Sequence, residues 1–267
     1  MSVRQRADDQ AQDRDADAGA VTRRPRRLRR RILLVIGALI LVGAVAFGGL
    51  LLVTPSVGNA RALARAQDRA HHAAYPGPPV PPRFAASIEA TEDHRFGYEP
   101  GIDPFAIARV AASWLTGGGT ADQGGATIYQ QLAKLLYTSG HSSTTDELEQ
   151  VSLAVKLFMT YSSEQILRMY ADVAYFGNGD YGLAAASCGY FGTVPAGLTL
   201  PAAATLAGLV QGPSADDPIA HYARGRAREA HVLGRLVATG KITAAQSARA
   251  YAQGLHLVGG SGRACAR

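Results

Sequence analysis

The stretch ELEQVSLAVKLFMTYSSEQILRMYADVAYF, residues 147–176, decides the fold class. Apolar residues recur at helical spacing on both sides of Ser162-Ser163-Glu164-Gln165, which is a typical helix start. Strand-like alternation of apolar and polar residues is scarce here and elsewhere in the chain. The stretch therefore predicts two consecutive helices in an all-α domain.

Further segments show the same helical spacing. They are FAASIEATEDHRF (84–96), DPFAIARVAASWL (103–115), ATIYQQLAKLLY (126–137), YGLAAASCGYF (181–191), LTLPAAATLAGLVQ (198–211) and GKITAAQSARAYAQG (240–254). Asp103 is a good N-cap, and Pro104 suits the first helical position. Glycine clusters at 117–125 and 176–182 are loops that could rim a cleft, because glycine lets the backbone approach a ligand.

An uncharged stretch, ILLVIGALILVGAVAFGGLLLV, runs from Ile32 to Val53. As a helix its 22 residues would extend over about 33 Å, enough to cross a bilayer core. RRPRRLRRR immediately precedes it, and fewer cations follow. The positive-inside rule therefore predicts a cytoplasmic N-terminus and an extracytoplasmic domain. A cleaved signal peptide and a buried helix are the alternatives.

The predicted organisation has five parts. They are a disordered basic cytoplasmic tail (1–31), a transmembrane helix (32–54), a helical neck with a Pro-rich spacer (55–83), the folded domain (84–260) and a short tail (261–267). The first tail holds ten arginines and five aspartates, a net +5 of the chain's +6. The rest of the chain is close to neutral, which argues against nucleic acid as a partner.

The chain has two cysteines, Cys188 and Cys265. They could pair in an exported domain, although two cysteines do not make a disulfide framework. The Ala-rich surroundings of Cys188 favour a small buried residue instead.

Four blocks follow one another behind the apolar span. They are ATEDHRFGYEPGIDPFAIARV (90–110), QGGATIYQQLAKLLY (123–137), residues 147–192, and LTLPAAATLAGLVQGPSADDP (198–218). In content, order and spacing they resemble the peptidoglycan glycosyltransferases, over about residues 84–255. This family comprises the transglycosylase module of class A penicillin-binding proteins and the monofunctional transglycosylases. No Ser-x-x-Lys follows the span, which favours the monofunctional type.

The resemblance implies a lysozyme-like, two-lobed helical fold. It also implies lipid II as substrate, a disaccharide-pentapeptide on undecaprenyl pyrophosphate, at the outer leaflet of the cytoplasmic membrane. The growing glycan chain and other cell-wall synthesis proteins are the further partners it suggests. The Ala- and Arg-rich, Lys-poor composition indicates a bacterium with a GC-rich genome.

The implied reaction joins a sugar hydroxyl to an anomeric carbon while a lipid pyrophosphate leaves. It needs a general base, and positive charge or hydrogen-bond donors for the leaving group. Glu92 stands where the family has its base, and Asp93 and Phe96 match their motif positions. A working base needs a raised pKa, from partial burial or from Asp93. The alternative is a solvated acid pair at a helix end.

The second block matches its family motif at Gly124, Gly125, Thr127, Ile128, Gln130, Gln131, Leu132 and Lys134. On a helix, Thr127, Gln131 and Lys134 share a face and could present donors to phosphates. Lys134 is one of three lysines and is the predicted pyrophosphate contact; a surface lysine is the alternative. The predicted substrate-binding residues are Asp93, Phe96, Thr127, Gln130, Gln131, Lys134 and Gln150.

Other positions depart from the family pattern. Glu99 replaces His, Ala126 replaces Ser, Tyr129 replaces Thr, Asp146 and Glu147 replace Arg and Lys, Gln150 replaces Glu, Ser163 replaces Lys, and Asp172 replaces Asn. The third motif alone changes the local charge by about −4, which disfavours a pyrophosphate. Arg168 or a divalent metal ion could compensate, and no other cofactor or protein metal site is expected.

Three functions compete. The first is an active but divergent glycosyltransferase that extends glycan chains. The second is an impaired or inactive relative that binds lipid II or glycan as a cell-wall scaffold, favoured by the third-motif departures. The third is a glycan-cleaving enzyme that uses Glu92 with Glu99 as a second carboxylate, and it is the least favoured.

Overall fold

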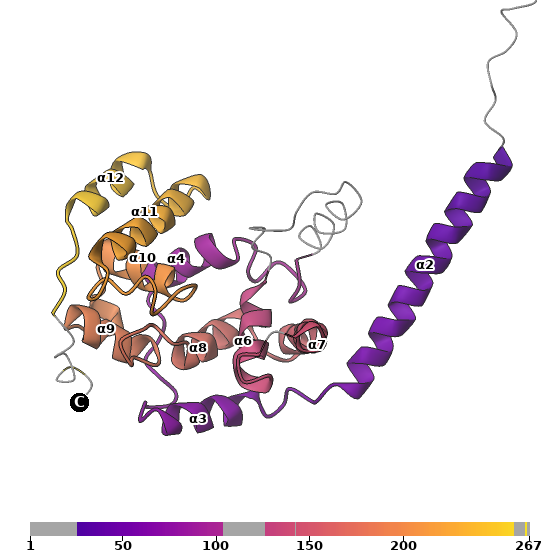
Figure 1. Cartoon of the computed structure of the whole chain (residues 1–267), viewed down its shortest axis with the longest axis horizontal. Helices are drawn as coiled ribbons and strands as arrows, with labels where there is room; N and C mark the ends of the chain where they lie inside the picture. The colour runs from indigo at the N-terminus through magenta and orange to yellow at the C-terminus, as the bar shows by residue number, and fades with distance from the viewer. Residues whose placement is uncertain (1–25, 104–125, 142, 259–264, 266–267) are drawn as a thin grey trace, which may run out of the picture. The chain divides into compact units, whose positions relative to one another are not determined.

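The computed structural model describes residues 26–103, 126–141, 143–258 and 265. Its helices are α2 (Arg26–Val53), α3 (Ala60–Ala70), α4 (Pro82–Glu92), α6 (Ile128–Tyr137), α7 (Thr144–Thr160), α8 (Ser163–Val173), α9 (Leu183–Phe191), η1 (Pro195–Gly197), α10 (Leu200–Leu209), α11 (Tyr222–Ala238) and α12 (Ala244–Ala252) (Figure 1). These residues include no strand, only an isolated bridge between Tyr175 and Tyr181. The predicted all-α class is confirmed over the described residues.

The apolar helix α2 begins earlier than predicted. Its first residue is Arg26, so the described part of the predicted disordered tail is helical. Arginine is a good helix former and continues the helix that the apolar span establishes. The segment Arg29–Val53 is long and apolar enough to cross a membrane. Residues 1–25 lie outside the described residues.

The helices of the globular domain pack in two groups. In the first group α6 contacts α3, α7 and α8, and α3 contacts α8; α4, α10, α11 and α12 form the second group. α9 contacts both α8 and α10. Figure 1 shows the first group below the second, in agreement with the two lobes that the resemblance implies.

Side-chain caps fix where several helices begin. Thr127, Ser143, Ser162 and Thr243 each accept a hydrogen bond from the backbone N–H three residues later, whose own side chain bonds back. This reciprocal capping satisfies two N–H groups that a helix start leaves without partners. The predicted helix start at Ser162 is confirmed.

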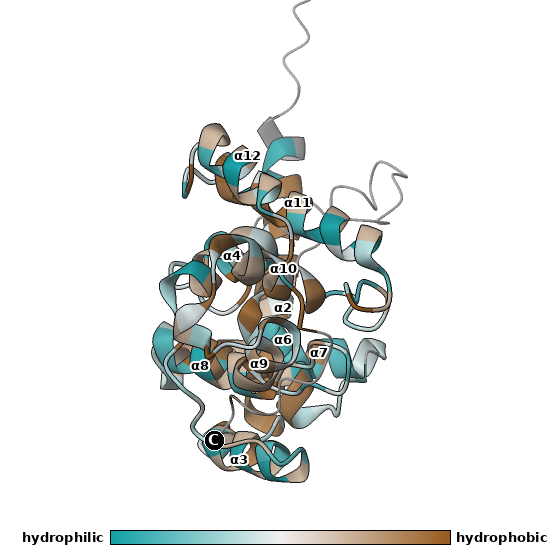
Figure 2. Cartoon of the chain, turned by 90° about the vertical axis from the view of Figure 1, so that its left-hand side faces the viewer, coloured by the Kyte–Doolittle hydropathy of each residue, from teal (hydrophilic) through white to brown (hydrophobic). Residues whose placement is uncertain are grey.

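The second group is centred on α10. Every residue of this helix from Pro201 to Leu209 is buried, because α4, α9 and α11 all pack against it. Its alanines and Gly208 leave room for these close neighbours. Figure 2 shows that hydrophilic residues are instead frequent along α11 and α12.

The predicted neck and spacer are built into the domain. Ala60 and Ala64 of α3 are fully buried, and α3 contacts α6 and α8. In the Pro-rich loop, the Gly77 N–H donates to Asp172 Oδ2 at 3.1 Å, and Arg168 Nε donates to the Gly77 carbonyl at 3.2 Å. The globular unit therefore includes residues 55–83, and the folded part does not begin at residue 84.

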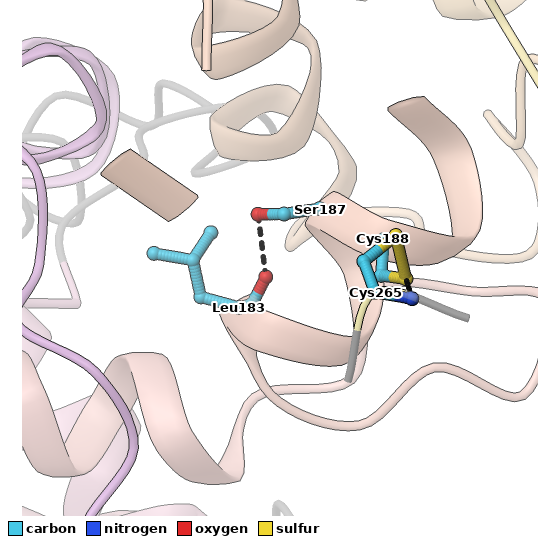
Figure 3. Close-up of a disulfide and its surroundings, with 4 residues drawn as sticks. All are labelled: Leu183, Ser187, Cys188 and Cys265. Atoms are coloured by element: carbon cyan, nitrogen blue, oxygen red, sulfur yellow. Dashed lines mark hydrogen bonds between the residues drawn. A yellow bond between two sulfur atoms is a disulfide. The ribbon is translucent and has the colours of Figure 1, made fainter. Parts of the chain in front are cut away.

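Cys188 and Cys265 form a disulfide (Figure 3). Their Cα atoms lie 5.6 Å apart, within the usual range for such a bond. Cys188 is buried as predicted, but its interpretation as a residue outside a disulfide is wrong. The bond holds Cys265 against α9, and a hydrogen bond from the Val258 N–H to the Tyr190 carbonyl holds Val258 there.

One predicted helix is shorter than expected, one helix was not predicted, and one predicted helix lies outside the described residues. The helix predicted over 84–96 ends at Glu92. α11 lies in a segment for which no helix was predicted. The helix predicted from Asp103 and the glycine cluster at 117–125 fall almost wholly outside the described residues.

Candidate active site

Glu92 is the last residue of α4. Asp93 ends the helix with φ −156° and ψ 78°. The half-buried Glu92 carboxylate reaches the first helix group, where Gln131 Nε2 of α6 donates to its Oε2 at 3.0 Å. The candidate base therefore lies where the two groups meet.

A second hydrogen bond orients Gln131. The Tyr170 hydroxyl, on α8, donates to Gln131 Oε1 at 2.7 Å. Tyr170 is almost fully buried, so its hydroxyl has a fixed position. Because the amide oxygen faces Tyr170, the amide nitrogen faces Glu92. The structure thus joins Gln131 to the candidate base.

The surroundings of Glu92 make it more basic than an ordinary carboxylate. Burial raises the pKa of Glu92, and the negative charge of Asp93 raises it further. The hydrogen bond from Gln131 and the charge of Arg228 lower this pKa, but burial is the larger effect. A raised pKa suits a general base that works near neutral pH.

Asp93, Thr127 and Gln130 tie the loop after α4 to the start of α6. Asp93 Oδ2 accepts from the Ile128 N–H at 3.1 Å, and the N-terminal end of a helix favours such an anion. Thr127 Oγ1 donates to the Gly101 carbonyl at 2.6 Å, while the Gln130 side chain accepts from the Thr127 N–H. The hydrogen bonds of these three side chains therefore hold the loop after α4 against the start of α6.

Phe96 and Gly101 press the same loop onto α6 and α7. Phe96 is buried, with its ring centroid 5.2 Å from that of Tyr129. Gly101 has φ +79°, and a Cβ there would lie 2.4 Å from the Ala154 carbonyl oxygen, so only glycine fits. The hydroxyls of Tyr129 and Ser163 lie 3.3 Å apart, so two departures from the family pattern contact each other.

A pocket of about 160 Å³ surrounds the candidate base. Its lining is Thr91, Glu92, Asp93, His94, Arg95, Glu99, Asp103, Ala126, Thr127 and Arg235. Glu99 is buried beside Asp93, and burial together with the Asp93 charge raises the pKa of Glu99 to about 7. Arg95 pairs with Glu99 at 3.6 Å and also with Asp103. The other carboxylates of the pocket are therefore held by protein groups: Asp93 by the Ile128 N–H, and Glu99 and Asp103 by Arg95.

Lys134 and Gln150 lie outside this pocket lining. Lys134 follows Gln131 by one turn of α6, is half-buried, and forms no ion pair with a described residue. Gln150 Nε2 donates to Thr138 Oγ1 at 2.9 Å and to the His141 carbonyl at 2.8 Å. The structure thus places Gln150 at the turn between α6 and α7, about 10 Å along α6 from Gln131.

The charged departures of the third motif lie at the start of α7. Asp146 bonds with Ser143, the N-cap of this helix, and Glu147 is exposed. Acids in a first helical turn are favourable because of the helix dipole. Neither residue lines the pocket of Glu92. Their negative charge is therefore accommodated by α7 itself.

Arg168 does not compensate for the lost cations at this pocket, because its guanidinium bonds to the Gly77 carbonyl. Two arginines of α11, Arg228 and Arg235, lie beside Glu92 instead. They were not predicted, and the number of arginines in the segment 222–238 was the available signal. In the part of the chain that the structure describes, no three His, Cys, Asp or Glu side chains are grouped to hold a metal ion.

A larger pocket of about 530 Å³ lies at the other end of α4. It is lined by Arg83, Thr199, Leu200, Pro201, Ile242, Gln246, Arg249, Ala250 and Gln253. Arg83 and Glu92 are nine residues apart on α4, which corresponds to about 13 Å. Because no carboxylate lines this larger pocket, the smaller one is the candidate for general-base chemistry.

Comparison with known proteins decides the family. Residues 59–237 match the family model described as Transglycosylase, which includes α3 to α11. The chain belongs to the transglycosylase family. The match begins at Asn59, so this transglycosylase domain includes the predicted neck. The helices described above fit the lysozyme-like fold that the resemblance implies.

Individual relatives agree with this assignment. The chain is 37% identical to penicillin-binding protein 1A of Escherichia coli over 167 residues, which is 62% of this chain and 20% of that protein. It is 34% identical over 164 residues to a Cupriavidus necator protein named as a transglycosylase, covering 61% of this chain and 70% of that protein. The chain thus spans about a fifth of the penicillin-binding proteins it matches.

A crystal structure of penicillin-binding protein 1A from Haemophilus influenzae also matches. It is 25% identical, with a TM-score of 0.35, and the match covers 50% of this chain and 17% of that chain. This TM-score is too low to add anything about the fold.

Proposed function

We propose that this transglycosylase polymerises lipid II into glycan strands, with Glu92 as general base and the lipid pyrophosphate as leaving group. One observation carries the proposal. The Glu92 carboxylate lies half-buried in a pocket between two helix groups, and Gln131 holds it in place. Burial raises its pKa, as a base requires.

The bond changes follow from this placement. Glu92 accepts the proton of a sugar hydroxyl, whose oxygen attacks the anomeric carbon of the neighbouring lipid-linked sugar. The bond from that carbon to the pyrophosphate oxygen breaks, and its electron pair leaves with the lipid pyrophosphate. Gln131 keeps the carboxylate oriented, because its own amide is fixed by Tyr170.

The other predicted site residues fall into two groups, one open to the substrate and one already bonded to the protein. Lys134 is available to the pyrophosphate, because it has no ion pair among the described residues. Asp93, Phe96, Thr127 and Gln130 hold the loop against α6 and serve the substrate by shaping the pocket. Gln150 lies away from this pocket and holds the turn between α6 and α7 through its hydrogen bond to Thr138. A divalent metal ion at the pyrophosphate stays a prediction.

The topology proposed for this enzyme is a single pass through the cytoplasmic membrane with the N-terminus inside. The apolar helix Arg29–Val53 and the arginines before it support this orientation. The domain then meets lipid II at the outer leaflet, together with the growing glycan chain and other cell-wall synthesis proteins.

A non-catalytic scaffold that binds lipid II or glycan is the second candidate. The observation that favours it is Gln150, which stands where the family has a second glutamate and donates to Thr138 and to the His141 carbonyl. An amide there cannot carry the charge of a carboxylate. The scaffold would keep the pocket and the membrane helix but would not turn substrate over.

The test is glycan polymerisation from labelled lipid II by the detergent-solubilised full chain. Glu92→Gln is compared with Glu89→Gln, a matched control one turn earlier on α4 whose carboxylate pairs with Lys241 outside the pocket. We expect polymer from the wild type and from Glu89→Gln, and none from Glu92→Gln. Binding of lipid II without polymer from the wild type would favour the scaffold.

A further inference from the structure

The larger pocket, of about 530 Å³, shares no lining residue with the pocket of Glu92. Its volume falls within the range of about 300–1,000 Å³ that is usual for ligand sites. Its walls come from the first turn of α4, the start of α10, the connection after α11, and α12. α12 lies at the edge of the second helix group (Figure 1). The pocket is therefore a second candidate site in the same domain.

α12 turns a largely polar face toward this pocket. Gln246, Arg249, Ala250 and Gln253 line it, with the spacing of three, one and three residues that belongs to one side of a helix. A helix that only packs on a core would place apolar side chains at such positions. Of the nine residues of α12, only Ala250 is buried. This face is thus suited to a polar ligand rather than to core packing.

The opposite walls combine an apolar surface with a fixed arginine. Leu200, Pro201 and Ile242 supply the apolar part. Arg83, in the first turn of α4, supplies the charge, and its Nη1 donates to the Leu198 carbonyl at 3.1 Å. This bond orients the guanidinium and leaves its other N–H groups open to a ligand.

The pocket carries a positive charge that no lining residue balances. Arg249 makes no hydrogen bond or ion pair with a described residue, and no Asp or Glu is among the residues that line the pocket. Gln246 uses its side-chain oxygen to accept the Thr243 N–H, so its NH₂ group remains as a donor. Arginine matches carboxylates with paired N–H groups. The pocket therefore favours a ligand that has carboxylates next to small apolar groups.

We infer that this pocket binds the pentapeptide of the lipid-linked substrate. That peptide is a short chain with free carboxylates and alanine methyl groups, which suit the two arginines and the apolar wall. The inference rests on the proposed function for its substrate. It adds a site for the peptide to the site where the sugars react.

The peptide is long enough to reach from one pocket to the other. Arg83 and Glu92 are nine residues apart on α4, which corresponds to about 13 Å. Five residues in extended conformation span about 17 Å. A substrate whose sugar lies beside Glu92 can therefore place the carboxylates of its peptide at Arg83 and Arg249.

The test is binding of the disaccharide-pentapeptide, without lipid or pyrophosphate, to the full chain in detergent micelles. The probe carries a fluorescent label on its reducing-end sugar, and binding is followed by anisotropy. Arg249→Ala removes a charge, Arg249→Lys keeps it, and Gln253→Glu adds a carboxylate of the same shape as the amide. Both side chains are exposed, so the fold is retained, and thermal unfolding checks this. Arg69→Ala, at an exposed arginine of α3 that lines neither pocket, is the matched control.

We expect Arg249→Ala to weaken binding ~10-fold or more, as for the loss of a hydrogen bond to a charged group. Gln253→Glu weakens it through repulsion of the peptide carboxylates, Arg249→Lys restores part of it, and Arg69→Ala leaves it unchanged. The unlabelled disaccharide-pentapeptide displaces the probe. The disaccharide without peptide does not, and neither does the pentapeptide with its carboxylates amidated.

Wild-type affinity in Arg249→Ala or in Gln253→Glu would overturn the inference. Displacement of the probe by the peptide-free disaccharide or by the amidated peptide would also overturn it, as would a wild type that does not bind the probe. The proposed function fails separately. If the probe binds through Arg249 but the wild type forms no polymer from lipid II, the enzyme proposal is lost and the peptide site remains. Polymer from a wild type that does not bind the probe would do the reverse.

Discussion

Replacing Gln131 by leucine tests how the site controls its base. Gln131 is the described side chain that donates to Glu92, and this bond stabilises the ionised form of the carboxylate. Gln131→Leu removes the donor and keeps a side chain of similar length. The pKa of Glu92 must therefore rise further, because burial and Asp93 still act on it.

The size of the effect follows from the bond that is lost. A hydrogen bond to a charged group contributes about 1.5–3 kcal/mol, and one pKa unit corresponds to about 1.4 kcal/mol. Since Glu92 is partly open to water, the lower end applies, and we expect a rise of about one unit. The leucine also leaves the buried Tyr170 hydroxyl without its acceptor, which lowers the free energy of unfolding by about 1–3 kcal/mol.

The assay is the pH dependence of kcat for lipid II polymerisation. The base must be ionised, so its acidic limb moves to higher pH by about one unit in Gln131→Leu. Tyr170→Phe keeps Gln131 as the donor to Glu92 and removes only the hydroxyl that orients the Gln131 amide, so the acidic limb of this variant moves less. A limb that stays in place or moves to lower pH in Gln131→Leu would refute the reasoning, whatever the change in rate.

Three further perturbations have defined outcomes. Gln150→Glu replaces an amide donor by a carboxylate that cannot donate to Thr138 and the His141 carbonyl. Urea unfolding should therefore show a free energy of unfolding lower by about 1–3 kcal/mol, and a higher value would contradict the assigned contacts. Burial, and after it the charge of Asp172, raises the pKa of the buried Asp68 to about 7. The folded protein therefore favours the protonated carboxyl, and the stability that Asp68 contributes is present below about pH 4 and lost as the pH rises through 7. Asp68→Asn should therefore gain stability over the wild type between pH 5 and pH 8 in thermal unfolding, and a constant difference would contradict this. Reducing the Cys188–Cys265 disulfide, which joins residues 77 apart, should lower the free energy of unfolding by up to about 4 kcal/mol, and an unchanged midpoint under reducing conditions would exclude a stabilising bond.

The helical class could be predicted because local signals agreed with it. The Ser162 cap and the apolar spacing around it placed two helices correctly. Their ends depended on tertiary structure: α8 stops at Val173 because Ala174 turns into extended backbone before the Tyr175–Tyr181 bridge. The helix α11 escaped prediction because its buried large apolar residues, Val232, Leu233 and Leu236, are confined to its second half.

The candidate site was predictable in part. The order of the motifs pointed to Glu92 and Gln131, whose roles stay predictions, and burial raises the pKa of Glu92 in the direction that a base needs. Helix geometry alone suggested that Gln131 faces phosphates, whereas it bonds to Glu92, because α4 ends against α6 in the folded domain. Arg235 could not be placed from the sequence, since its position beside Glu92 depends on how α11 packs on α4.

Turnover and lipid II binding, measured on the same preparation of wild type and Glu92→Gln, test the central claim most directly. We predict that both proteins bind lipid II with similar affinity and that the wild type forms glycan polymer. Loss of the general base should slow Glu92→Gln by about 100-fold or more. A Glu92→Gln variant that polymerises at the wild-type rate would contradict the role of Glu92, and a wild type that binds without polymerising would contradict catalysis itself.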